Sequence, residues 1–151
     1  MNLKEPVGLC IAMSSGGLDI GTSLFTFLTA NDVVYIIDGR IYTFAATDEL
    51  EFSAGHTDLA EGEVCVFGLF LDTSGNVSSV QSNIVAAADL AGGIVWIRPP
   101  TWIRNKVMFG MIRVETDHST TFTPGTTELD AAGLTVTYIN CASHQSRNIV
   151  S

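Results

Sequence analysis

The sequence predicts an all-β protein, a β-sandwich or jelly roll of about eight strands with one short helix. Many short runs are rich in β-branched and aromatic residues and are separated by turn-forming residues. Two such runs flank Asp38-Gly39, and an Asp-Gly pair favours a type I′ hairpin turn, which needs positive φ at both central residues. The 151 residues fit one domain with a substantial core.

The first expected strands are residues 23–28 (SLFTFL) and 33–38 (VVYIID), and the Asp-Gly turn leads from the second into RIYTF. The polar residues 45–63 predict a long loop with one short strand. VCVFGLFLD, residues 64–72, is nearly all apolar, which is typical of a strand buried on both faces. The turn DTSGN then leads into VSSVQ, which predicts a second hairpin.

The one helical pattern is SNIVAAADLAGG, residues 82–93, with Ser82 or Asn83 as its N-cap. IVWI, residues 94–97, predicts a further strand, which Pro99-Pro100 would end. KVMFGMIRVET predicts a long strand in which a glycine marks a bulge or a close backbone approach. LTVTYIN, at residues 134–140, predicts the last strand.

The strand pattern divides the chain into an N-terminal arm (1–22), a β-sandwich body (23–140) and a C-terminal tail (141–151). The arm mixes apolar residues with glycines, and we expect it to add a strand to the sheet edge of a neighbouring subunit. Its candidate contact residues are Leu9, Ile11 and Met13.

Composition limits the partners. Hydrophobic residues make up 46% of the chain and charged residues 15%, which argues against disorder and suggests that a partner covers some surface. The net charge of -9 argues against nucleic acid, because phosphate binding needs clustered Lys and Arg. The N-terminus is a poor signal peptide and is too short to span a membrane, so no membrane partner is expected. Cys10, Cys65 and Cys141 form no CxxC pair, which favours a reducing compartment, and Cys65 is expected to be buried.

The charges are unevenly spread along the chain. One stretch gathers acidic residues: Asp48, Glu49, Glu51, Asp58, Glu61 and Glu63. Another gathers basic residues: Arg98, Arg104, Lys106 and Arg113. Either these are two solvated faces, or they meet opposite charges on neighbouring subunits, where complementarity sets the register of the contact.

Catalytic and cofactor motifs are missing from the sequence. His56, His118 and His144 lie far apart and form no HxH or HExxH arrangement. The sequence has no GxSxG, GxGxxG or GxxxxGK[ST] motif. Asp48 and Glu51 belong to an acidic loop that is expected to be solvated. We therefore expect no catalytic, cofactor-binding or metal-binding residues, and no enzyme.

The stretch between the two tryptophans is the strongest candidate for an interface. Pro99 and Pro100 cannot donate ladder hydrogen bonds, so this stretch must leave the sheet. Arginine and tryptophan are enriched at interface hot spots. The candidates are Arg98, Pro99, Pro100, Trp102 and Arg104. The other interpretation is that Trp96 lies in the core and Trp102 covers a sheet edge.

Three stretches carry a resemblance: IDGRIYTFAATDELEFSAG, LFLDTSGNVSSVQS and FGMIRVETDHSTTFTPGTTELDAAGLTVTYIN. They resemble a group of small tailed-bacteriophage virion proteins that open with xDGxxYxxAAT and close with FxPGTTxLDAxGxTxTYxN. The resemblance covers about residues 36–140, and the closing motif is its most specific part. The Trp-containing middle departs most from the pattern, and the arm and the tail do not match it.

The resemblance implies a non-enzymatic capsid decoration or cement protein, made in the host cytoplasm and located on the capsid surface of the virion. Its expected partners are the major capsid protein and further copies of itself, in a dimer or trimer. The competing hypothesis is a tail-fibre or spike domain that binds a host surface glycan, with Trp102 and the acidic loop at the sugar site. Fibres usually contain coiled-coil or repeat stretches, and this sequence has none.

Overall fold

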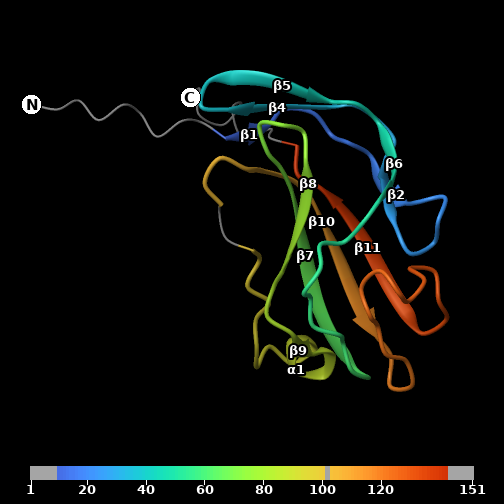
Figure 1. Cartoon of the computed structure of the whole chain (residues 1–151). Helices are drawn as coiled ribbons and strands as arrows, with labels where there is room; N and C mark the ends of the chain where they lie inside the picture. The colour runs from blue at the N-terminus through green and yellow to red at the C-terminus, as the bar shows by residue number, and fades with distance from the viewer. Residues whose placement is uncertain (1–9, 101–102, 143–151) are drawn as a thin grey trace, which may run out of the picture.

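The computed structural model describes residues 10–100 and 103–142. Within these ranges the chain forms eleven strands and one short helix, and the strands make three antiparallel sheets (Figure 1). The predicted all-β class with one short helix is confirmed. There are more strands than expected because four of them have only two or three residues.

The largest sheet has the order β11-β10-β7-β8, and a short strand, β9, also pairs with β7. Its strands are β7 (Glu63–Leu71), β8 (Val77–Gln81), β9 (Val85–Ala86), β10 (Val107–Thr116) and β11 (Leu134–Asn140). The smaller sheets have the orders β1-β4-β5 and β2-β3-β6. Their strands are β1 (Ile11–Ala12), β2 (Leu18–Ile20), β3 (Phe27–Thr29), β4 (Val33–Ile37), β5 (Arg40–Phe44) and β6 (Thr47–Leu50).

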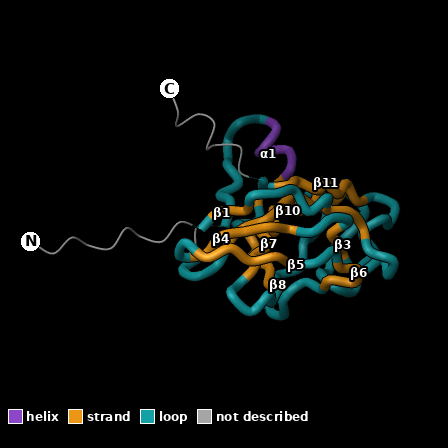
Figure 2. Tube along the Cα trace, turned by 90° about the horizontal axis from the view of Figure 1, so that it is seen from above, coloured by secondary structure: helices purple, strands orange, loops and turns teal. Residues whose placement is uncertain are grey.

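The core lies between the large sheet and the two smaller ones. One buried cluster joins side chains from both layers, among them Phe27, Val33, Tyr35, Ile37, Cys65, Phe67, Leu69, Phe109 and Ile112. In Figure 1, β4 and β5 run across the upper end of the large sheet, and Figure 2 shows the layers from above, with α1 at one side. This is the predicted sandwich packing, with the second layer divided into two small sheets.

The central strand β7 is buried on both faces, as predicted from its apolar sequence. Every residue from Val64 to Leu71 is buried. Alternate residues, such as Phe67, face the core cluster. On the opposite face Pro100 lies over Gly68, so close that a Cβ on this glycine would stand 2.8 Å from the proline Cγ. The connection between β9 and β10 therefore covers part of the second face.

Both predicted hairpin turns are present. Asp38 and Gly39 have φ values of 51° and 77° and join β4 to β5, with Ile37 opposite Arg40. This is the two-residue turn that positive φ at both central positions allows. In the turn between β7 and β8, the Asp72 carboxylate accepts hydrogen bonds from the N–H groups of Ser74 and Asn76, at 2.8 and 2.9 Å.

The expected N-terminal arm over residues 1–22 is wrong for residues 10–22. β1 pairs with β4, with Ile11 opposite Ile36, and β2 pairs with β3, with Leu18 opposite Thr29. These strands belong to the two small sheets of their own chain. Their backbone groups are paired there, and the Leu18 side chain is buried in the core. Residues 1–9, including Leu9, lie outside the described residues, as do residues 143–151 of the expected tail.

The segment after β8 differs most from prediction. The helix is only α1 (Ala87–Ala91), and it begins without a side-chain cap. The predicted strand over residues 94–97 is wrong, because no strand forms there. The Asn83 side chain explains both differences: its amide donates to Trp96 O at 2.9 Å, and its carbonyl accepts from Arg98 N at 2.7 Å. Asn83 therefore fixes an irregular segment instead of capping the helix.

Gly110 in β10 marks a bulge, as predicted, because the register with β7 shifts between Met108 and Gly110. It also marks a close approach: a Cβ at this position would stand 2.1 Å from Leu18 Cδ1 and 3.1 Å from the Ile139 carbonyl oxygen. β2 therefore packs against β10 only where β10 lacks a side chain.

The loop between β10 and β11 is held on both sides. Phe122 exchanges backbone hydrogen bonds with Leu59 in both directions, at 2.9 and 3.0 Å. Leu129 is buried in the core, and its N–H donates to Leu24 O at 2.8 Å. Leu129 is therefore held both by its side chain and by its backbone. The first part of the closing motif is thus a fixed loop, and its last part is β11.

Candidate functional site

Buried polar groups are candidates for a functional site. In the described part of the chain four polar residues are buried: Thr26, Thr29, Ser79 and Thr116. Their hydroxyls bind backbone groups of the chain; the Thr116 hydroxyl, for example, donates to Ala60 O at 2.6 Å and accepts from Glu63 N at 3.0 Å. Within residues 10–100 and 103–142, no group of three or more His, Cys, Asp or Glu side chains could hold a metal ion. No helix there is long and apolar enough to cross a membrane.

Among the described residues, His56 and Ser79 form a contact that resembles a catalytic pair. The His56 Nε2 atom lies 2.7 Å from the Ser79 hydroxyl oxygen, which also accepts a hydrogen bond from Ser53 N at 2.8 Å. The Ser79 N–H in turn donates to the Ser53 hydroxyl at 2.9 Å. The Gln81 side-chain amide binds the backbone of Thr57 in the same region: its oxygen accepts from Thr57 N, and its NH2 group donates to Thr57 O, each at 2.8 Å. The pair therefore ties the loop of residues 53–57 along the edge of β8, which is a structural role.

Removing the His56 imidazole is expected to change how stability depends on pH. Burial lowers the pKa of His56 from its ordinary value of 6.5, so the unfolded chain binds a proton at higher pH than the folded one. Stability is therefore lost as pH falls below 6.5. Urea unfolding at about pH 7.5 and about pH 5.5 measures the free energy of unfolding at each pH. The decrease between the two pH values should be smaller for His56→Gln than for the wild type. An unchanged loss in His56→Gln would contradict the prediction.

The cysteines are packing residues. Cys65 is fully buried, as predicted, and burial raises the pKa of its thiol to about 11. Burial also raises the pKa of Cys141. Because the thiolate is the reactive form, these groups are poor nucleophiles at neutral pH.

The acidic stretch uses several of its carboxylates within the chain. Asp48 accepts hydrogen bonds from the Thr22 hydroxyl and the Thr22 N–H, and these bonds lower the pKa of Asp48. The Glu63 carboxylate accepts from Ala60 N at 2.7 Å. These contacts give Asp48 and Glu63, two of the six carboxylates of this stretch, a structural role in holding loop backbone.

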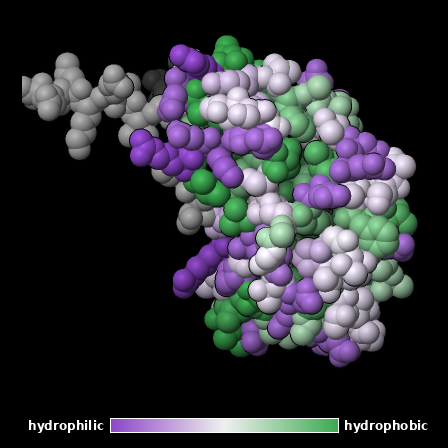
Figure 3. Space-filling view, in the orientation of Figure 1, coloured by the Kyte–Doolittle hydropathy of each residue, from purple (hydrophilic) through white to green (hydrophobic). Residues whose placement is uncertain are grey.

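The connection between α1 and β10 exposes large apolar side chains, in what we call the 94–98 surface (residues 94–98). Ile94 is 74% exposed and Trp96 is 75% exposed. A hollow of about 330 Å³ is lined by Asn83, Val85, Ile94, Val95, Trp96 and Arg98. Figure 3 shows strongly hydrophobic side chains at its lower left, over the part of the chain that holds α1 in Figure 1. The interpretation that Trp96 belongs to the core is wrong.

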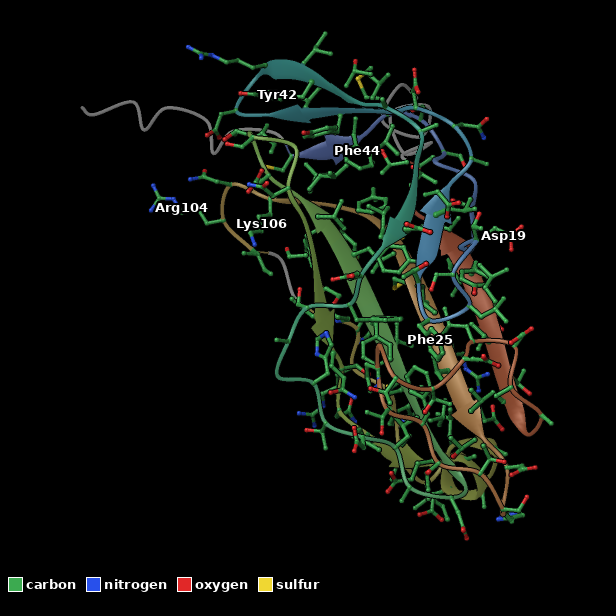
Figure 4. The ribbon with its side chains drawn as sticks, turned by 45° about the vertical axis from the view of Figure 1, so that its right-hand side comes forward. Asp19, Phe25, Tyr42, Phe44, Arg104 and Lys106 are labelled. Atoms are coloured by element: carbon green, nitrogen blue, oxygen red, sulfur yellow. The ribbon has the colours of Figure 1, made fainter. Side chains whose placement is uncertain are left out.

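Basic side chains lie on the 94–98 surface and further along the same connection. Arg98 and Arg104 are exposed, and the Lys106 ammonium donates to the Ser78 hydroxyl at 3.0 Å. Figure 4 shows Arg104 and Lys106 on the same side of the molecule. Among the described residues the one ion pair is Arg113–Glu115, at 2.8 Å, so Arg98 and Arg104 form none there.

The structure separates the predicted interface residues into three groups. Arg98 and the exposed Pro99 lie on the 94–98 surface or next to it, whereas Pro100 packs on β7. Ile11 is half-buried in β1, and Met13 is exposed just after that strand. Leu9 and Trp102 lie outside the described residues. Sequence reasoning missed Ile94 as a contact candidate, because the composition of residues 94–97 predicted a strand there.

No protein-family model matches the chain, and neither a curated protein nor a solved structure is significantly similar to it.

Proposed function

We propose that this protein is a bacteriophage virion structural protein of the decoration or cement type. It binds the outer surface of the capsid and stabilises contacts between major capsid subunits. The class of protein is proposed from the resemblance of residues 36–140 to small tailed-bacteriophage virion proteins. The observation that carries the proposal is the exposed 94–98 surface, an apolar and cationic patch on a rigid β body.

The chemistry of this patch suits a protein partner. Tryptophan and arginine dominate interface hot spots, because both combine a large contact area with a polar group. Asn83 holds the backbone of residues 96–98 in place, so little conformational freedom is lost when the surface is covered. Arg98 favours a capsid surface that is apolar at its centre and acidic at its rim. Many symmetric copies on one shell would add avidity.

Removing the apolar side chains of this surface should weaken capsid binding. We expect Ile94→Ala combined with Trp96→Ala to lower the affinity at least about tenfold, since hot-spot side chains contribute about 2 kcal/mol or more. The fold should survive, because both side chains are exposed and the Asn83 contacts use only backbone atoms at 96 and 98. Cosedimentation with capsids that lack the protein measures the loss.

Ile41→Ala is the matched control. Ile41 is 67% exposed but lies on β5, in a different sheet. It should bind capsids like the wild type. Equal binding by the Ile94/Trp96 variant and the wild type, or an equal loss with Ile41→Ala, would contradict the proposed surface.

The glycan-binding alternative has less support. It assigns the sugar contacts to Trp102 and the acidic loop, and in that loop the Asp48 and Glu63 carboxylates are bound to backbone within the chain. Electron microscopy of purified virions separates the two functions. A cement protein would cover the shell in many copies, whereas a fibre or spike domain would lie on the tail.

A further inference from the structure

β11 is an edge strand with one free side. It pairs only with β10, in an unbroken register that runs from Gly110 opposite Asn140 to Thr116 opposite Leu134. Figure 1 shows it at the margin of the large sheet, and Figure 4 shows the same margin from the side. An edge of this kind presents a row of hydrogen-bonding groups to another strand.

The outward groups can be assigned from the alternation of an antiparallel pair. The N–H of Cys141 donates to Phe109 O at 3.1 Å and so faces β10. Alternate residues face the same way, so Thr137 also turns its backbone groups to β10. Val136 and Tyr138 turn theirs to the free side. These N–H and C=O groups are available to a further strand.

Most other sheet edges in the described part of the chain are blunted. β6 carries Asp48 and Glu49, and Glu49 has a left-handed φ of 57°. β5 begins with an arginine and is short. β8 is covered by residues 53–57. β1 and β2 have only two and three residues. β11 has seven residues, no charge, no proline and no bulge. Natural sheets normally protect such an edge, so its regularity indicates a partner strand.

We propose that two copies of this chain pair through β11, antiparallel about a two-fold axis at Thr137, so that the two large sheets become one continuous sheet. In this register Thr137 lies opposite Thr137 of the second copy, and Val136 lies opposite Tyr138. Thr135 then lies opposite Ile139. The inference concerns the chain alone and does not depend on capsid binding.

The side chains of β11 match one another across this axis. Val136 and Tyr138 both pack against the core cluster from the edge of the sheet, and their pairing joins a β-branched and an aromatic residue, a favourable cross-strand combination. On the outer face the axis brings threonine against threonine, and Thr135 against Ile139, which is 36% exposed. No pair places like charges opposite each other. The strand is therefore complementary to itself.

Charge near the axis is balanced although the chain as a whole is acidic. Arg113 lies across from Thr137 on β10 and is paired with Glu115. The net charge of -9 still makes two copies repel each other at long range. We therefore expect the dimer to tighten as salt is added, because screening weakens this repulsion and leaves the uncharged strand contact unchanged.

The proposed dimer is tested by placing a charged residue at the two-fold axis. Thr137→Glu places two carboxylates opposite each other in the dimer, while in each copy the new carboxylate lies beside Arg113, so the fold should be kept. Sedimentation velocity should show a dimer for the wild type and a dimer constant weakened at least about tenfold for Thr137→Glu. The matched control is Thr43→Glu, at an exposed threonine of the edge strand β5, and it should remain dimeric.

A second experiment mixes two variants that carry opposite charges at position 137. Thr137→Lys alone should also be monomeric, and an equal mixture of Thr137→Lys and Thr137→Glu should form a heterodimer, because opposite charges then meet at the axis. Far-UV circular dichroism and thermal melting check that each variant is folded. The proposal is overturned by a monomeric or trimeric wild type, by a Thr137→Glu dimer of wild-type affinity, or by a mixture that stays monomeric.

Discussion

Phe67→Ala is expected to lower the free energy of unfolding by about 3–5 kcal/mol, because it removes a fully buried ring and leaves a cavity that its neighbours cannot fill. Phe67 lies near the middle of β7 and is 0% exposed. Its ring centroid lies 5.0 Å from that of Phe52, 5.1 Å from that of His56 and 6.2 Å from that of Phe122. One side chain thus joins the central strand to two loops.

Urea unfolding followed by tryptophan fluorescence measures this loss. Phe25→Ala is the control, because Phe25 is 37% exposed in the turn before β3. We expect this control to cost less than about 1 kcal/mol. A loss below about 1.5 kcal/mol for Phe67→Ala would show that the surrounding aromatic rings close the gap, contrary to the packing described for this core.

Gly110→Ala is expected to cost about 1–3 kcal/mol, because the new methyl group meets Leu18 and the Ile139 carbonyl oxygen where the chain leaves no room. Leu18 can yield by rotation, but it then leaves its buried place against the core. The backbone carbonyl of β11 cannot move without disturbing its pairing with β10. The substitution therefore strains the contact between β2 and the large sheet.

A double-mutant cycle with Leu18→Ala isolates this contact. The combined variant should be less destabilised than the sum of the two single variants, by at least about 0.5 kcal/mol, because the shorter side chain at position 18 makes room for the methyl group. Gly92→Ala is the control: Gly92 has an ordinary φ of -78° and a nearest neighbour at 3.4 Å. It should change stability by less than about 0.5 kcal/mol. Strict additivity at positions 18 and 110 would remove the steric explanation.

Sequence predicted the parts of this fold that are decided locally. The Asp38-Gly39 turn needs only positive φ at two residues. The run from Val64 to Leu71 is apolar at nearly every position, which predicts burial on both faces without knowledge of what covers them. Gly110 likewise stands out inside a strand pattern. In each case a few adjacent residues determine the structure.

Long-range contacts decided the parts that were not predicted. β1 and β2 are too short to have a strand pattern, and they form because β4 and β3 offer them an edge. Residues 94–97 have a strand composition, yet the Asn83 side chain holds them in an irregular path. Trp96 is exposed on this path, so the alternative interpretation that placed it in the core is wrong. The proline pair correctly predicted that the chain leaves the sheet, but the proline pattern did not show which apolar residues would be exposed.

The position of β7 also affects the order in which the protein folds. β8 follows β7 directly, but β10 must return from the far end of the long connection to place Val107 opposite Leu71. Closing such a loop is slow compared with forming a hairpin. Until β10 arrives, a newly made chain presents its most apolar strand with one side unpaired, and such strands promote aggregation. The time that β10 needs to reach β7 therefore sets how long this strand stays exposed to aggregation.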